Sequence, residues 1–164
     1  MMIRWLIVFA TTTALTGCGL ADAKSPEPLP KIEACFVTDD QAHPVILETA
    51  SDSKTRQKGL MGRQALAENA GMLFSYDYER RPEQGFWMYK TMIPLDIAFL
   101  DKRGTIVSIR QMHPCASSRS NDCPGYPAGA AYWHAVEMNL GYFNRRNIAI
   151  GDHLTRGEAA DCSP

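Results

Sequence analysis

After residue 30 the chain is built mostly of short runs in which branched or aromatic side chains alternate with polar ones. Turn-forming residues separate these runs, which occupy residues 31–38, 44–49, 72–76, 86–90, 95–100, 105–112, 132–138 and 152–156. The stretch from Asp101 to Gly104 is typical of a hairpin turn, because glycine tolerates positive φ. The spacing predicts a mainly β fold, either an antiparallel sandwich or a jelly-roll-like barrel.

Helical signals are confined to two short segments. Ser51 and Ser53 are candidate N-caps of a helix that ends at Gly59, where glycine can form a left-handed C-cap. A second helical turn is predicted at residues 64–68. The 164 residues have room for one domain of ordinary size. We assign this single β domain, with its one or two short helices, to residues 31–164.

The N-terminus has the architecture of an export signal. One positive charge, Arg4, precedes an apolar run that leads to small residues around Gly17. The four residues that end at Cys18 resemble the bacterial lipobox, in which the cysteine is diacylated and becomes the new N-terminus. The sequence therefore predicts a signal peptide at residues 1–17 and lipidation of Cys18. An uncleaved membrane anchor is the alternative, which the threonines of this segment disfavour.

The segment that follows is expected to be a linker to the membrane. Residues 18–30 contain three prolines and little that could enter a core. Residue 19 is glycine rather than aspartate, which in lipoproteins of two-membrane bacteria implies delivery to the outer membrane. We therefore expect an exported protein that is lipid-anchored in the outer membrane and faces the periplasm. Its expected partners are the membrane, through the anchor, and an envelope component such as a glycan.

Four cysteines remain if Cys18 carries lipid. An even number of thiols in an exported protein predicts two disulfides. The short loop between Cys115 and Cys123 favours pairing within itself, which leaves Cys35 with Cys162. A redox role is the alternative, but the sequence has no Cys-x-x-Cys motif that would lower a thiol pKa.

The charge pattern argues against a nucleic-acid partner. The chain has 17 basic and 18 acidic residues, and its longest basic cluster is Arg145 with Arg146. Proteins that bind phosphate backbones normally carry a basic patch or stripe. We therefore expect no binding to nucleic acid.

Residues 86–99 suggest a hairpin with a candidate ligand-binding face. A four-residue turn at 91–94 would place Tyr89 opposite Asp96 and Trp87 opposite Ala98. The other face would then be apolar and belong to the core. Aromatic side chains beside a carboxylate suit a sugar or another polar ligand with apolar patches. The alternative is structural: Asp96 accepts hydrogen bonds from its own turn or from Tyr89.

Several short motifs together carry a family resemblance. They are Gly59-Leu-Met-Gly-Arg63, Gly71-Met-Leu-Phe74, Phe86-Trp-Met88, Pro94-Leu-Asp-Ile97, Phe99-Leu-Asp101, Pro114-Cys115, Val136-Glu137 and Gly151-Asp152. In this order and spacing they resemble the domain of unknown function 192 family. The resemblance implies a compact, mainly β, sandwich-like domain, often exported, with no established reaction. Where that family usually has Lys-Asn-Thr after its Trp-Met, this chain has Tyr89, Lys90 and Thr91.

The candidate site therefore consists of five residues, Arg63, Trp87, Tyr89, Asp96 and Glu137. Arg63 is a candidate partner for either carboxylate, since guanidinium binds carboxylate bidentately. We predict a binding module for a small polar or glycan ligand rather than an enzyme. No cofactor or metal is expected, because serine-nucleophile motifs, phosphate-cradling glycine loops and zinc spacings are absent from the sequence.

Three other functions stay open at this point. A structural or assembly lipoprotein needs no ligand. A hydrolase could use Asp96 and Glu137 as a carboxylate pair. Methionines near His113 and His134 suit Cu(I), although core packing explains most of them.

Overall fold

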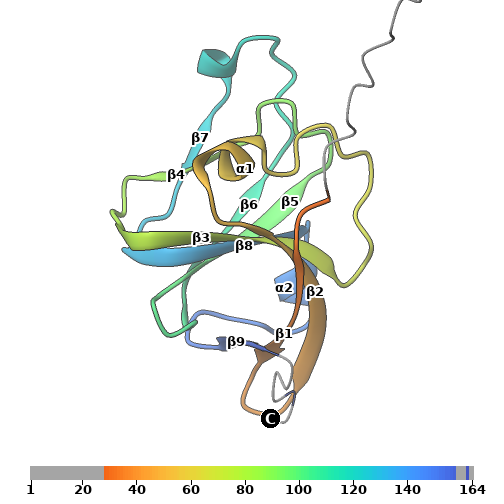
Figure 1. Cartoon of the computed structure of the whole chain (residues 1–164), viewed down its shortest axis with the longest axis vertical. Helices are drawn as coiled ribbons and strands as arrows, with labels where there is room; N and C mark the ends of the chain where they lie inside the picture. The colour runs from red at the N-terminus through yellow and green to blue at the C-terminus, as the bar shows by residue number, and fades with distance from the viewer. Residues whose placement is uncertain (1–27, 158–161, 163–164) are drawn as a thin grey trace, which may run out of the picture.

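The computed structural model describes residues 28–157 and Cys162. Seven strands form one curled sheet with the order β6-β5-β8-β3-β2-β1-β9, and β4 pairs with β7 in a separate ribbon (Figure 1). The strands are β1 (Lys31–Val37), β2 (Ala42–Ala50), β3 (Ala70–Arg80), β4 (Gly85–Trp87), β5 (Leu95–Leu100), β6 (Ile106–Met112), β7 (Gly125–Pro127), β8 (Tyr132–Asn139) and β9 (His153–Arg156). The helices are α1 (Ser53–Lys58), α2 (Tyr142–Arg145) and the 3-10 turn η1 (Ser120–Asp122). The predicted mainly β fold with two short α-helices is confirmed.

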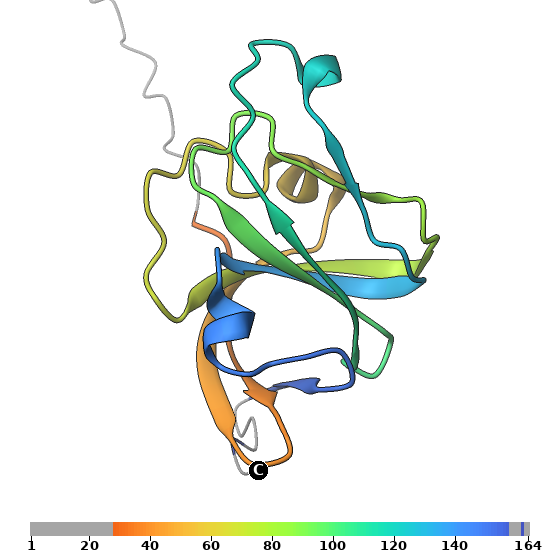
Figure 2. The same ribbon diagram turned by 180° about the vertical axis from the view of Figure 1, so that it is seen from behind.

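Apolar side chains fill both faces of the curled sheet, because successive residues of a strand point to opposite sides. Along β5, Ile97 and Phe99 belong to one buried cluster, whereas Ala98 belongs to the other. We call the first the α1-side core, since the chain after α1 contributes Leu60 to it. The second, here the α2-side core, contains Phe143 of α2. The two helices lie on opposite sides of the β3–β8 pair (Figures 1 and 2).

The connection from β2 through α1 to β3 produces a parallel strand pair within the sheet. Asp52, rather than the predicted Ser51 or Ser53, is the N-cap of α1: its side chain accepts hydrogen bonds from Lys54 N at 2.9 Å and Thr55 N at 3.0 Å. The hydrogen bonds from Thr55 hold the pKa of this carboxyl below its usual value. Gly59 ends the helix as predicted, but at φ 47° and ψ −137° it does not adopt the predicted left-handed helical conformation.

The predicted hairpin between residues 86–90 and 95–99 is wrong. β5 pairs with β6 on one side and β8 on the other, and β4 pairs with β7 instead. The reason is that every residue of β5 is buried, so this strand lies inside the sheet, between β6 and β8, and takes two long partners. Lys90, at φ 56°, turns the chain away before β5 begins.

Two smaller helix predictions also differ from the structure. No helix forms at residues 64–68, which are loop and turn. The helix α2 was not predicted, because its four residues are too few to show a helical period. Among the described residues, no helix is long and apolar enough to cross a bilayer.

Both predicted disulfides are present. Cys35 of β1 is joined to Cys162 near the C-terminus, and Cys115 is joined to Cys123 across the loop that precedes β7. The first bond ties the start of the sheet to the end of the chain, and the second closes a loop that projects from the end of the domain where α1 lies (Figure 1). The predicted signal peptide and Cys18 lie outside the described residues.

Candidate functional site

Glu137 is the most unusual ionisable residue of the described structure. It lies in β8, opposite Met72 of β3 and Ile97 of β5, and only 4% of its surface is exposed. Its side chain points to the α1 side of the sheet, where it lines a small cavity of about 90 Å³. The cavity lies between the end of α1, β3 and β4, and its lining includes Gly59, Leu60, Phe74, Tyr76, Phe86, Trp87 and Thr91. We call this cavity the Glu137 pocket.

The carboxyl group of Glu137 has no hydrogen-bond or ion-pair partner among residues 28–157 and Cys162. Burial alone raises its pKa from 4.5 to about 8. At neutral pH the group is therefore largely protonated, so that it can donate one hydrogen bond and accept others. A carboxyl in this state can bind a neutral hydroxyl or carbonyl group that enters the pocket.

Aromatic side chains form the walls of the Glu137 pocket. The Phe74 and Phe86 rings meet edge to face, with centroids 4.8 Å apart. Trp87 stands at the rim with 38% of its surface exposed. Thr91 is buried and also lines the cavity. The pocket thus combines apolar walls with a carboxyl and a hydroxyl, a composition common in sites for small polar molecules.

A basic cluster borders the same pocket. The Tyr76 ring lies 4.8 Å from the Arg56 guanidinium carbon and 4.7 Å from that of Arg80. Arg56 also donates a hydrogen bond to the Ser75 carbonyl at 2.9 Å, which fixes its position on the pocket wall. Burial raises the pKa of the Tyr76 hydroxyl well above its usual value, so this group stays neutral.

The structure does not bring Asp96 together with Glu137 or Trp87. Asp96 pairs in register with Met138, one residue beyond Glu137, so the two carboxyl groups point to opposite faces of the sheet. Asp96 is 2% exposed, and its Oδ2 accepts a hydrogen bond from the Phe143 amide at 3.4 Å, at the start of α2. A hydrolytic mechanism with these two groups on either side of one bond does not fit this arrangement.

Arg63 lies beside the Glu137 pocket rather than in it. Its guanidinium forms an ion pair with Glu48 of β2, and neither Asp96 nor Glu137 is its partner. Arg63 and Glu48 line a groove that also includes Leu29 and Lys58. We call this groove the linker groove, since the described chain begins along it at Pro28.

Tyr89 connects the pocket rim to the disulfide-closed loop. Its ring centroid lies 5.8 Å from that of Trp87, and its hydroxyl donates a hydrogen bond to the Ser118 carbonyl at 3.2 Å. Within the loop, Arg119 pairs with Asp122. The loop therefore holds Tyr89, and through it Trp87, in place beside the pocket.

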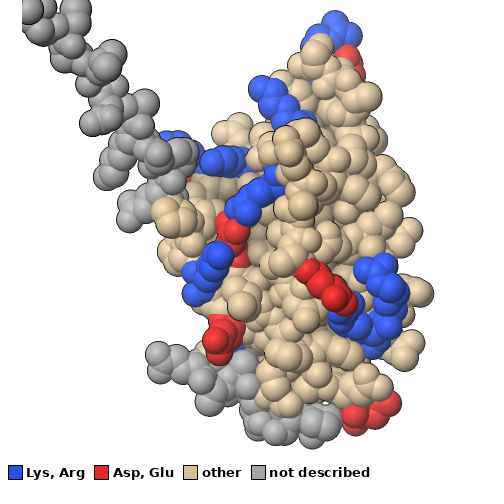
Figure 3. Space-filling view, turned by 90° about the vertical axis from the view of Figure 1, so that its right-hand side faces the viewer, with Lys and Arg blue, Asp and Glu red and all other residues tan. Residues whose placement is uncertain are grey.

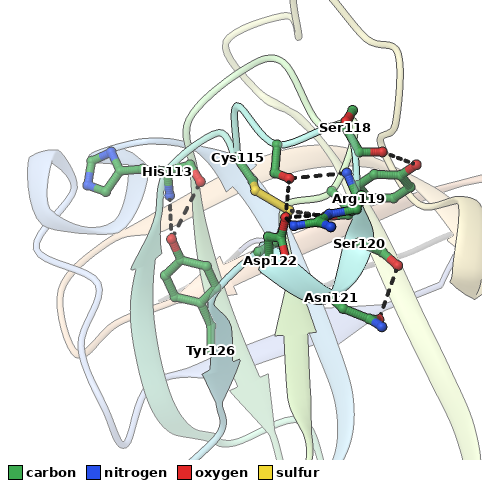
Figure 4. Close-up of a disulfide and its surroundings, with 11 residues drawn as sticks. His113, Cys115, Ser118, Arg119, Ser120, Asn121, Asp122 and Tyr126 are labelled. Carbon is green, nitrogen blue, oxygen red and sulfur yellow. Dashed lines mark hydrogen bonds and ion pairs between the residues drawn. A yellow bond between two sulfur atoms is a disulfide. The ribbon is translucent and has the colours of Figure 1, made fainter.

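A further hydrogen bond closes the base of this loop. The Tyr126 hydroxyl of β7 accepts from the His113 amide at 3.1 Å (Figure 4). The loop is thus crosslinked at two levels, by this bond and by the disulfide between Cys115 and Cys123. Both crosslinks fix β7, and β7 is the strand that pairs with β4 at the pocket rim.

Comparison with protein families identifies the chain. A family model described as "Uncharacterized ACR" matches residues 35–156. The chain belongs to the domain of unknown function 192 family, DUF192. The resemblance noted from Gly59 to Asp152 is confirmed. Among curated proteins, no relative of this DUF192 protein was found.

Two solved structures resemble this DUF192 domain. One, from Sinorhizobium meliloti 1021, is described as a proposed transcription regulator and is 28% identical to this chain. The match has a TM-score of 0.71 and covers 80% of this chain and 98% of the Sinorhizobium chain. The other is a protein of unknown function from Novosphingobium aromaticivorans, also 28% identical, with a TM-score of 0.66 over 89% of this chain and 99% of its own. The fold of this DUF192 domain is thus shared by chains of similar length.

The methionines of this DUF192 domain are distributed over both cores. Met72, Met88 and Met112 are fully buried on the α1 side, and Met138 is buried on the α2 side. No group of three or more His, Cys, Asp and Glu side chains among the described residues could hold a metal ion. Packing accounts for these four thioethers, whereas Met92 is exposed.

Sequence reasoning found two residues of the pocket and missed others. Trp87 and Glu137 line it as members of the predicted site. Tyr76 and Thr91 were missed, because their neighbours in space come from distant strands. One signal could have identified Thr91. It matches the threonine of the family's Lys-Asn-Thr motif, but the two residues before it, Tyr89 and Lys90, differ from that motif.

Proposed function

We propose that this protein is a lipid-anchored envelope protein whose DUF192 domain binds a small polar ligand, such as a sugar of the envelope, in the Glu137 pocket. One observation carries the proposal: a buried carboxyl group without a partner among the described residues faces an accessible cavity. Buried polar groups in folded proteins are nearly always hydrogen-bonded, and leaving one unpaired costs about 1–3 kcal/mol. A ligand hydroxyl would supply the missing partner.

The walls of the pocket fit the same kind of ligand. The exposed face of Trp87 can cover the apolar face of a sugar ring, while Thr91 offers a hydroxyl for orientation. The cavity, at about 90 Å³, is too small for a whole sugar ring, so a ligand would insert one polar group and rest the remainder against Trp87. Tyr89 supports the position of Trp87 from behind.

The envelope location rests on the N-terminal sequence. A signal peptide at residues 1–17 and a lipidated Cys18 would place the domain on the periplasmic side, and Gly19 favours the outer membrane. Two disulfides fit an oxidising compartment. Cys18→Ala should release the protein from membranes into the soluble fraction, and an intact leader in mass spectrometry would contradict the anchor.

A thermal-shift screen against envelope sugars tests the ligand. N-acetylglucosamine, glucose and galactose are suitable neutral probes, and the wild-type melting temperature should rise with at least one of them. Glu137→Leu and Trp87→Ala should each weaken binding about tenfold or more, since the first variant loses the hydrogen bonds of the carboxyl group and the second loses an aromatic contact.

Asp96→Asn is the matched control, because Asp96 is equally buried but faces the other core. It should keep the ligand-induced shift of the wild type. A shift that survives in Glu137→Leu, or that Asp96→Asn abolishes, would contradict the proposed pocket.

A further inference from the structure

The end of the domain that carries the Glu137 pocket is also the end where the described chain begins. Pro28 and Leu29 line the linker groove together with Lys58, Gly59 and Met61. The last three residues line the Glu137 pocket as well, so the groove and the pocket share one rim. Figures 1 and 2 both show the start of β1 on the same side of the sheet as α1. A linker of some ten residues from Cys18 would therefore leave the domain beside the pocket.

Exposed aromatic and apolar side chains surround this rim. Trp87, which lines the pocket, is 38% exposed, and Met92, which follows Thr91 of the pocket wall, is 54% exposed. Tyr89 packs against Trp87 and carries the Lys90 ammonium 5.1 Å above its ring. Tryptophan and tyrosine beside lysine are the side chains that sit at the headgroup level of membranes.

Lysines without acidic partners lie around the same rim. Lys54 and Lys58 of α1 and Lys90 of the following loop are exposed, and none of them forms an ion pair with a residue of the described chain. Basic side chains are also visible close to the start of the described chain in Figure 3, although acidic ones are interspersed over the rest of that face. Lysines near an anionic bilayer surface each strengthen binding by about fivefold.

We infer that this end of the domain docks onto the surface of an anionic membrane, with Trp87 and Met92 at the headgroup level and Lys54, Lys58 and Lys90 against lipid phosphates. The inference rests on the proposed lipid anchor, which would hold the linker groove close to the bilayer, and it deepens the proposed function. The Glu137 pocket then opens toward the membrane surface, so its ligand is a polar headgroup presented there. A second copy of this chain is the competing occupant of the same face.

Tryptophan fluorescence in lipid vesicles tests the docking. The chain has three tryptophans, so Trp5→Phe with Trp133→Phe leaves Trp87 as the only one. The lipidated protein is reconstituted into vesicles of phosphatidylglycerol and phosphatidylcholine with brominated acyl chains. Trp87 fluorescence should fall relative to vesicles without bromine, as expected of an aromatic ring at the interface.

The matched control leaves Trp133 as the only tryptophan, through Trp5→Phe and Trp87→Phe. Trp133 belongs to β8, and its ring lies 4.8 Å from the Lys102 ammonium. Lys102 is in the turn between β5 and β6, which lies on the other side of the β3–β8 pair from α1 (Figures 1 and 2). Its fluorescence should not change in brominated vesicles. Equal quenching of Trp87 and Trp133 would overturn the proposed orientation, and so would the absence of quenching at Trp87.

Charge reversal separates docking from the anchor. Lys54→Glu, Lys58→Glu and Lys90→Glu together should abolish Trp87 quenching although Cys18 keeps its lipid, whereas Arg103→Glu in the β5–β6 turn should have no effect.

If mass spectrometry shows no lipid on Cys18, the anchor proposal fails. In that case docking is tested by the same quenching measurement on the protein mixed with excess vesicles. The triple variant should bind the vesicles about 100-fold more weakly than the wild type, because each lysine contributes about fivefold. Self-association of the free protein through Trp87, without quenching by lipid, would overturn the inference.

Discussion

At the scale of single residues, Glu137 makes the stability of the domain depend on pH. Its pKa in the folded protein, about 8, lies above the usual 4.5 because the group is buried. Between these values the folded state keeps a proton that the unfolded state releases. The free energy of unfolding is therefore highest below the usual pKa, falls as the pH rises, and levels off above the folded-state pKa.

Glu137→Gln should remove most of this pH dependence. The amide has no charge to desolvate, so the variant should be more stable than the wild type by on the order of 3 kcal/mol at about pH 8.5, and nearly equal to it at about pH 4.5. Urea unfolding at both pH values measures the difference. Parallel pH profiles for the two proteins would contradict the raised pKa of Glu137.

The backbone conformation of Lys90 lowers the stability of the folded protein. Its φ of 56° is a left-handed conformation that Asn adopts more readily than Lys. The asparagine that the family usually has at this position fits that geometry. Lys90→Asn should raise the free energy of unfolding by about 0.5–1 kcal/mol, measured as a higher urea midpoint. Lys102→Asn, at an exposed turn residue without positive φ, should change it by less than about 0.5 kcal/mol.

At the scale of secondary-structure elements, Asp96 joins β5 to α2. Its carboxylate accepts from the Phe143 amide, one of the N–H groups that a helix start leaves unpaired. Asp96→Ala should lower the free energy of unfolding by about 1–3 kcal/mol, because this buried amide loses its acceptor. Chemical denaturation measures the loss. Wild-type stability in this variant would show that Asp96 does not support α2.

The loop closed by Cys115 and Cys123 is a second element with a measurable role. Replacing both cysteines by serine should lower the free energy of unfolding by about 2–3 kcal/mol, the chain entropy of a loop this short. The variant should also bind the ligand more weakly, since Tyr89 loses a fixed contact at Ser118. Denaturation followed by ligand titration checks both effects, and unchanged affinity would contradict the supporting role of the loop.

Element predictions from the sequence succeeded where the signal was local. The alternation within strands and the glycine after α1 predicted the mainly β class and the end of that helix. The pairing of residues 86–90 could not be predicted in this way, because β4 takes its partner from β7, across the disulfide-closed loop. Pairing between strands that are far apart in the sequence depends on which strands lie inside the sheet and which lie at its edges. This arrangement is set by the complete sheet and not by one local segment.

The same reasoning limits what the sequence could say about the site. Trp87 and Glu137 were predicted as separate residues, and the structure brings both to one pocket. Asp96 was grouped with Trp87 through the wrong hairpin. In the structure the strand alternation of β5 sends Asp96 to the opposite face. Residues that are close in the sequence can therefore lie far apart in space, because successive side chains of β5 point into different cores.

At the scale of the whole molecule, the curled sheet divides the domain into two sides with different roles. The α2 side contains Asp96 and the Phe36 and Phe143 rings in edge-to-face contact. The α1 side carries the Glu137 pocket, the linker groove and the exposed aromatic rim. We expect substitutions on the first side to change stability and those on the second to change binding.

The most direct test of this account is a ¹³C NMR titration of the Glu137 carboxyl group in protein labelled at glutamate, with and without the sugar that the thermal-shift screen selects. Glu137→Gln assigns the resonance. The account predicts that the carboxyl titrates near pH 8 in the free protein and that the sugar changes both its chemical shift and its pKa. A carboxyl that titrates near its usual pKa of 4.5 and does not respond to the sugar would contradict the proposed site.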